Sequence, residues 1–181
     1  MKLIIEGVDN SGKTRLSKFL AKELGLIYIN EQYKHLFNFK FEPNQWKFFV
    51  NGFNAQTLNI FGCFDNFIKD RFHLSEYVYS EYYNRESFLP FDTIENELLK
   101  MSDVLLIFLD SDFEIYQKRV DPSEETVTFE NKYEYNAHRK LFIQAYLNSK
   151  LKKIHINTSK NCWSGMQKQI LYFIEEVKKN S

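Results

Sequence analysis

Eight residues near the N-terminus form a run that can bind phosphate. Gly7 to Thr14 read GVDNSGKT and match the pattern G-x-x-x-x-G-K-T. Glycines let backbone N–H groups close around phosphate oxygens without a Cβ in the way, and the first turn of a following helix adds its unpaired N–H groups and positive dipole end. In this pattern the lysine neutralises the outer phosphates and the threonine places its hydroxyl on Mg²⁺. We therefore expect a triphosphate cradle, against the alternative of a tight turn without a ligand, formed by Gly7, Asp9, Asn10, Ser11, Gly12, Lys13 and Thr14.

Charged residues follow two further strand candidates. Asp70-Arg71 comes after the third candidate, and Glu31 comes after the second. Ligands of open α/β sheets lie at the carboxyl ends of the strands, so both groups are expected near the cradle. There Asp70 can hold Mg²⁺ or orient an acceptor oxygen, and Arg71 offers a two-pronged guanidinium for phosphate. Glu31 can act as a general base or orient Mg²⁺. A surface ion pair at 70–71 and a solvated loop carboxylate at 31 are the alternatives.

An aromatic-rich stretch from Phe37 to Ile60 contains candidates for contact with a nucleobase. Aromatic rings stack on bases with ~1–3 kcal/mol each, and Asn or Gln side chains read the polar edge of a base. The named candidates are Trp46, Phe49, Phe53 and Gln56. The alternative is that these rings form the ordinary core side of an amphipathic helix. A tyrosine cluster at 77, 79, 82 and 83 is a second group that can approach the acceptor, or serve packing.

These residues require an alternating α/β framework to bring them together. Apolar periodicity predicts strands at 2–7, 26–30, 66–69, 103–110 and 153–157, and helices at 13–24, 44–61, 73–83, 91–101, 113–119, 132–147 and 163–178. The run DVLLIFLD from Asp103 to Asp110 is typical of a central strand covered on both faces. Strands that alternate with helices predict right-handed crossovers and a three-layer α/β fold. Residues 120–130 are polar and predict a loop.

Composition restricts the class of protein. With 181 residues we expect one domain, 1–181, and 44% apolar residues suffice for a core. The formal net charge of zero argues against a nucleic-acid partner. Cys63 and Cys162 have no metal or disulfide spacing, which predicts reduced structural thiols. No signal peptide or membrane span is evident, so no membrane partner and a cytoplasmic location are expected.

The phosphate-binding pattern does not by itself name a reaction, because GTPases, ATPase motors and kinases share it. Motors need a larger oligomeric apparatus than this chain offers. GTPases need a base-reading Asn-Lys-x-Asp, whereas the nearest run here is Asn131-Lys132-Tyr133-Glu134, which we interpret as the start of a helix. A kinase is the remaining class.

Two motifs together resemble the thymidylate kinase family, including phage-encoded nucleoside and nucleotide kinases. Glu6 to Thr14 (EGVDNSGKT) is similar to its E-G-x-D-G-x-G-K-T loop, and Asp70-Arg71-Phe72 to its D-R-[YF] motif. Phe108 to Arg119 resembles the strand and helix that lead into the family's lid, and IHINTS at 154–159 resembles its final strand and adenine-packing loop. The resemblance spans most of the chain and is strongest at the first two motifs.

The resemblance implies a P-loop kinase fold with a mostly parallel five-stranded sheet, ATP and Mg²⁺ as cofactors, transfer to a nucleoside monophosphate, and often a homodimer. It implies P-loop roles for Lys13 and Thr14, a Mg²⁺ and acceptor role for Asp70, an acceptor-phosphate role for Arg71, and a role near adenine and the phosphates for Arg119.

The sequence differs from the family in two respects, so acceptors other than a common nucleoside monophosphate remain alternatives. Phe53 falls near the place where the family carries an acceptor-gripping Arg, and the candidate lid at 120–130 contains no Arg. Lys34, Lys40 or Arg85 can restore the charge. A site with fewer cations suits a deoxynucleoside, with Glu31 as base on the 5′-hydroxyl, or an unusual monophosphate. A kinase acting on DNA and a non-catalytic ATP-binding regulator are further alternatives.

Overall fold

A five-stranded parallel sheet is the centre of the molecule. The computed structural model describes residues 1–30, 43–84, 90–120 and 129–180, with the side chains of residues 43–51 left out. The sheet has the order β2-β3-β1-β4-β5, and every neighbouring pair is parallel. The strands are β1 (Lys2–Gly7), β2 (Ile27–Ile29), β3 (Phe67–Asp70), β4 (Val104–Asp110) and β5 (Lys152–Asn157). The expected five-stranded sheet is therefore confirmed.

Seven helices connect or follow these strands in the described part of the chain. They are α1 (Lys13–Leu24), α2 (Pro43–Cys63), α3 (His73–Tyr82), α4 (Phe91–Leu99), α5 (Phe113–Arg119), α6 (Lys132–Asn148) and α7 (Trp163–Lys179). Each lies within two residues of its predicted bounds. Two predicted boundaries have a clear physical cause. Gly25 ends α1 in the left-handed conformation at φ 64°, and Asn131 caps α6 by accepting from the N–H groups of Tyr133 and Glu134.

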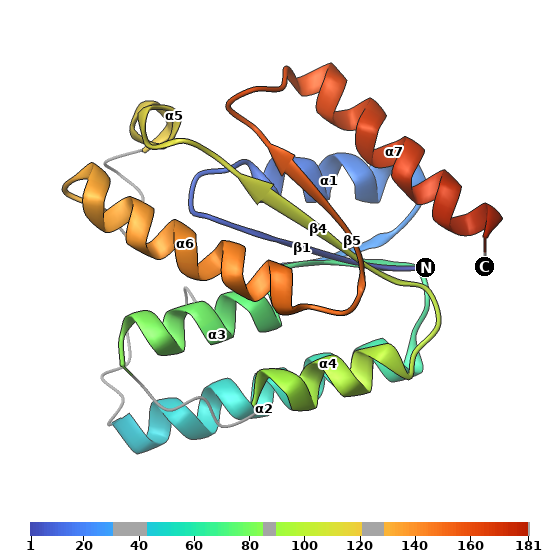
Figure 1. Cartoon of the computed structure of the whole chain (residues 1–181). Helices are drawn as coiled ribbons and strands as arrows, with labels where there is room; N and C mark the ends of the chain where they lie inside the picture. The colour runs from blue at the N-terminus through green and yellow to red at the C-terminus, as the bar shows by residue number, and fades with distance from the viewer. Residues whose placement is uncertain (31–42, 85–89, 121–128, 181) are drawn as a thin grey trace.

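The helices cover the sheet on both faces, which gives the expected three layers (Figure 1). On one face α1 and α7 pack against inward residues that include Leu3, Ile5 and Ile107. On the other face α2, α3, α4 and α6 pack against Ile4, Leu106 and other residues of the second cluster. Alternate residues of β1 and β4 enter opposite cores, so burial on both sides explains why these strands are almost continuously apolar.

This topology brings several chain segments to one edge of the sheet. The carboxyl end of β1 lies between those of β3 and β4, and Ile5 is in register with Asp70. The loop after β1, the residues after β3 and the loop after β5 therefore share one edge. None of the described helices is long and apolar enough to cross a membrane. Cys63 and Cys162 are free thiols, and both lie exposed at the surface.

Candidate functional site

The loop between β1 and α1 has a backbone that depends on its glycines. Gly7 has φ 141°, and a Cβ there would lie 1.9 Å from the carbonyl oxygen of Leu109 in the neighbouring strand. Gly12 has φ 93°, and Asn10 also has a positive φ of 54°. The Ser11 hydroxyl closes the loop by donating to the Val8 carbonyl at 2.8 Å. Among the described residues no side chain caps the N-terminus of α1, so its first-turn N–H groups and dipole favour an anion at the loop.

Lys13 places its ammonium group inside this loop. The side chain is buried, and Nζ donates to the Val8 carbonyl at 2.5 Å. Burial lowers the pKa of Lys13 to about 8, and the nearby charge of Arg71 adds to the decrease, while Asp9, Asp70 and Glu6 oppose it. A phosphate group near Nζ would favour the protonated form, so an added anion would raise the pKa of Lys13.

Thr14 and Asp70 meet across the sheet edge with oxygen atoms suited to a hard cation. The Thr14 hydroxyl donates to Asp70 Oδ2 at 2.7 Å, and the Tyr28 hydroxyl donates to the same oxygen at 3.1 Å. Burial and the Asp70 carboxylate raise the pKa of Tyr28, which keeps its hydroxyl a proton donor. Mg²⁺ binds through one or two protein oxygens while keeping several waters and substrate phosphates. The Thr14–Asp70 pair fits such an ion.

Arg71 directly follows Asp70 in the chain and contacts the phosphate loop. Its backbone has φ 62°, and its guanidinium forms an ion pair with Asp9. Nη1 also donates to the Ser75 hydroxyl at 3.1 Å and to the Gly7 carbonyl at 3.5 Å. The two residues that the sequence placed in separate motifs are thus joined by a charge pair.

Asp9 has a different environment from the rest of the loop. We predicted it as part of the triphosphate cradle, and the structure turns its carboxylate toward α3. There it accepts hydrogen bonds from the Tyr79 hydroxyl at 3.0 and 3.1 Å. Burial alone would raise the pKa of Asp9, but the charges of Arg71 and Lys13 outweigh it and the pKa is lowered. Asp9 is consequently an ionised carboxylate held between a guanidinium and a phenol.

Arg119, at the end of α5, reaches the outer side of the loop. Its Nη1 donates to the Asn10 carbonyl at 3.2 Å and to the Thr158 hydroxyl at 3.0 Å. This connects the phosphate loop with the segment after β5, where the family resemblance places adenine.

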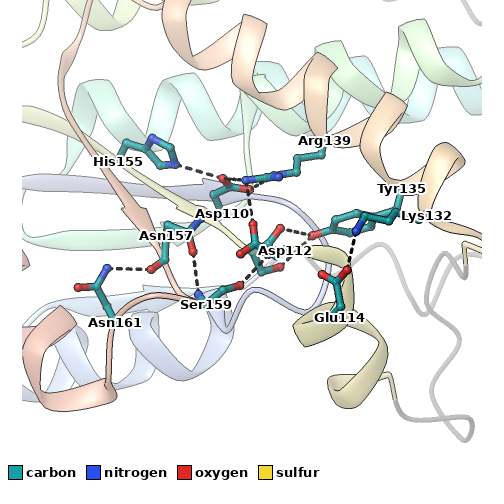
Figure 2. A network of polar contacts seen from close by, with 11 residues as sticks. Asp110, Asp112, Glu114, Lys132, Tyr135, Arg139, His155, Asn157, Ser159 and Asn161 are labelled. Carbon is teal, nitrogen blue, oxygen red and sulfur yellow. Dashed lines mark hydrogen bonds and ion pairs between the residues drawn. The ribbon is translucent and has the colours of Figure 1, made fainter.

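A polar network fixes the start of that segment, as Figure 2 shows. Arg139 on α6 donates to both oxygens of the buried Asp110 carboxylate at 2.6 Å each. The Asp112 N–H donates to the Ser159 hydroxyl at 2.7 Å, and the Ser159 N–H donates to Asn157 Oδ1 at 2.8 Å. The carboxyl ends of β4 and β5 are thereby held together beside the site.

The other predicted site residues belong to segments outside the described residues or to α2. Glu31, Lys34, Lys40, Arg85 and most of the candidate lid lie outside the described residues. Trp46 and Phe49 belong to α2, but their side chains are not described. Phe53 is half-buried and Gln56 is exposed on the same helix.

Three further residues contribute to the site area. Tyr28 and His138 were not predicted from the sequence, and Tyr79 was predicted only as one member of a tyrosine cluster. Tyr28 contacts Asp70, Tyr79 contacts Asp9, and His138 lies against the Tyr79, Tyr82 and Phe129 rings at centroid distances of 5.5, 5.0 and 4.8 Å. The spacing of four residues from Ser75 to Tyr79 was an available signal, because such positions share one side of a helix.

His138 is a completely buried histidine. It is 0% exposed, and neither ring nitrogen has a partner among the described residues. Burial lowers the pKa of His138 to about 4, with Asp9 opposing the decrease and Arg71 and Lys13 adding to it. The ring is therefore neutral near pH 7.

Known proteins resemble this chain in fold rather than in sequence. No model of a protein family matches the chain, and no curated protein sequence does. Among solved structures, the YorR protein from Bacillus subtilis, in complex with phosphorylated GDP, has a TM-score of 0.70 at 21% identity, covering 97% of this chain and 96% of that one.

Two named kinases are also similar in structure. A deoxyadenosine kinase from M. mycoides, solved with the products dCMP and dCDP, has a TM-score of 0.64 at 14% identity, covering all of both chains. A thymidylate kinase from Candida albicans has a TM-score of 0.62 at 17% identity, covering 99% of this chain and 93% of that one. The chain thus has the fold of P-loop nucleoside and nucleotide kinases, as the resemblance implied.

Proposed function

We propose that the protein is a thymidylate-kinase-like phosphotransferase that moves the γ-phosphoryl group of ATP to a nucleoside monophosphate. The observation that supports this most is the position of Asp70 and Arg71 beside the phosphate loop, with Thr14 on Asp70 and Asp9 on Arg71. The fold shared with a thymidylate kinase supports a phosphotransferase of this kind.

In this proposal the loop residues hold the donor. Lys13 and the first turn of α1 bind the outer phosphates, and the Thr14 hydroxyl and Asp70 carboxylate hold Mg²⁺. The ion supplies charge neutralisation at the transferred group when it is bound. An acceptor oxygen forms the new bond to the γ-phosphorus as the bond to the ADP oxygen breaks, so positioning and charge neutralisation by the protein are what the reaction needs.

Arg71 has the central role on the acceptor side. Its guanidinium now pairs with Asp9, a carboxylate on the phosphate loop. A monophosphate offers the same planar guanidinium a doubly charged partner, with bidentate hydrogen bonds. Transfer of Arg71 from Asp9 to the acceptor phosphate would leave the Asp9 carboxylate and the Tyr79 hydroxyl available to hydroxyl groups of the acceptor.

A deoxynucleoside kinase is the second candidate. The deoxyadenosine kinase matches this chain over its full length, and the sequence carries Glu31 just after β2 as a candidate base. In that reaction the acceptor is uncharged, so the Arg71–Asp9 pair would remain in place and Glu31 would take the proton of the 5′-hydroxyl.

A substrate panel with two variants tests the proposal. ADP release is measured with each common deoxynucleoside and each deoxynucleoside monophosphate, in ATP and Mg²⁺. We expect turnover with a monophosphate, loss of turnover in Lys13→Ala with the fold intact, and a rise in the monophosphate KM of about tenfold or more in Arg71→Ala. Turnover with nucleosides alone, abolished by Glu31→Gln, would replace the proposal with the second candidate. Unchanged turnover in Lys13→Ala would refute the cradle, and ATP binding without transfer to any acceptor would indicate a regulator.

A further inference from the structure

One carboxylate of β1 is completely buried, and so far it has entered only through its charge near Lys13. Glu6 is 0% exposed and directly precedes the phosphate loop. Its Oε1 accepts hydrogen bonds from the backbone N–H groups of Phe72, Leu74 and Ser75 at 2.7, 3.0 and 3.2 Å. Its Oε2 accepts from the Ser75 hydroxyl. A buried carboxylate is costly unless it is hydrogen-bonded in this way.

The Glu6 carboxylate on β1 caps the N-terminus of α3. The first N–H groups of a helix have no partner within the helix, and its N-terminus favours a negative charge. The N-cap residue of α3 is Phe72, whose side chain offers no hydrogen-bond acceptor. The Glu6 carboxylate therefore fixes the first turn of α3 against the end of β1, 66 to 69 residues away in the sequence.

The segment held by this cap is the one that presents Arg71. Arg71 has φ 62°, a left-handed conformation that costs a non-glycine residue on the order of 1–3 kcal/mol and persists only when its surroundings determine it. The N–H group that follows it, on Phe72, is bound by Glu6. The Ser75 hydroxyl donates to Glu6 and accepts from Arg71 Nη1 at 3.1 Å. One hydroxyl thus links the buried carboxylate to the guanidinium.

We propose that Glu6 and Ser75 are positioning residues for acceptor binding: Glu6 fixes the turn that carries Arg71, and Ser75 sets the direction of its guanidinium. This inference rests on the proposed function for the identity of the ligand, an acceptor phosphate, but the arrangement of Arg71 is a property of the ligand-free protein. The consequence is that removing the Ser75 hydroxyl weakens acceptor binding without affecting the triphosphate cradle.

The test compares two serines of the same helix. Ser75→Ala removes the link to Arg71, and Ser80→Ala removes a buried hydroxyl that donates to Glu76 at 3.1 Å. We expect Ser75→Ala to raise the KM for the monophosphate about tenfold, since a hydrogen bond to a charged group contributes at least that factor, while kcat and the KM for ATP stay near wild type. Ser80→Ala should change none of them. Glu6→Gln should raise the same KM and also lower the Tm, because it weakens the cap of α3.

A readout without turnover separates this inference from the proposed function. The order parameter of the Arg71 Nε–H group, from ¹⁵N relaxation of the ligand-free protein, should fall in Ser75→Ala and remain unchanged in Ser80→Ala. An unchanged order parameter in Ser75→Ala would overturn the inference, whichever reaction the protein catalyses, as would a monophosphate KM equal to that of Ser80→Ala. Absence of transfer by the wild-type protein would instead count against the proposed function, and the relaxation result would still decide this one.

Discussion

Replacing His138 by phenylalanine should change how the stability of the protein depends on pH. The native pKa of His138 is about 4, and the ordinary value of 6.5 applies to the unfolded chain. Between these values the unfolded chain binds a proton that the native protein does not, so the free energy of unfolding falls as the pH decreases from about 6.5 to about 4. Each pKa unit corresponds to 1.36 kcal/mol, which gives a total loss of about 3 kcal/mol from this residue.

The assay is urea unfolding of the wild-type protein and His138→Phe at a series of pH values from 7 to 4.5. Over that range the wild type should lose about 2 kcal/mol more than the variant, because phenylalanine has no proton to bind. At pH 7 the variant should be at least as stable as the wild type, since it removes two buried nitrogens that lack partners in the described part of the chain. Other carboxylates titrate in both proteins and cancel in the difference.

Phe129→Leu is the matched control, because Phe129 is buried against the His138 ring and does not titrate. Its destabilisation should be the same at every pH. Parallel curves for the wild type and His138→Phe would mean that the native histidine titrates like an exposed one, and the argument from burial would be wrong.

Three further predictions concern the loop and its helices. Gly7→Ala should lower the free energy of unfolding in urea by about 3 kcal/mol or more, because the new Cβ would clash with the Leu109 carbonyl. Gly62→Ala is the control: its Cβ would meet open space on α2, so it should raise the free energy of unfolding by about 0.5–1 kcal/mol. Equal effects of the two substitutions would contradict the clash at Gly7. Asn131→Ala should lower the free energy of unfolding by about 1 kcal/mol by removing the cap of α6, and a change below about 0.3 kcal/mol (about a third of a typical cap) would reject that role. ATP binding at pH 8.5 should take up most of a proton, since the pKa of Lys13 is about 8 before the triphosphate raises it. Calorimetry in two buffers of different ionisation enthalpy measures this uptake, which should vanish at pH 6.5, and equal proton numbers at both pH values would exclude Lys13 as the group.

Much of the fold could be predicted because it depends on local patterns. Strands that are buried on both faces are continuous apolar runs, as in Val104–Asp110. Helices are predicted by their apolar periodicity and by capping residues such as Gly25. The meeting of Thr14 with Asp70 also followed from general rules, since parallel strands end at one edge of the sheet.

The side-chain partnerships could not be predicted, because they depend on contacts between distant segments. Glu6 belongs to the motif at 6–14 but had no predicted role, and only its contact with α3 makes it a cap. The Asp9 carboxylate is held by Arg71 and Tyr79, which lie 62 and 70 residues further along the chain. His138 is buried because α6 packs on α3, and a single sequence contains no sign of that contact.

The central place of β1 has a consequence for synthesis of the chain. Leu3 pairs with Ile68, 65 residues further along, and with Leu105, 102 residues further along. At ~5–20 residues per second, the ribosome delivers the first of these partners roughly 3 to 13 seconds after the apolar strand has been made. During that interval β1 can pack only on α1 while both of its hydrogen-bonding edges stay open. Expression should therefore yield more native protein when a holding chaperone is present, or at a low temperature that slows aggregation. Substitutions that destabilise α1 should reduce the yield more than equally destabilising substitutions in α7.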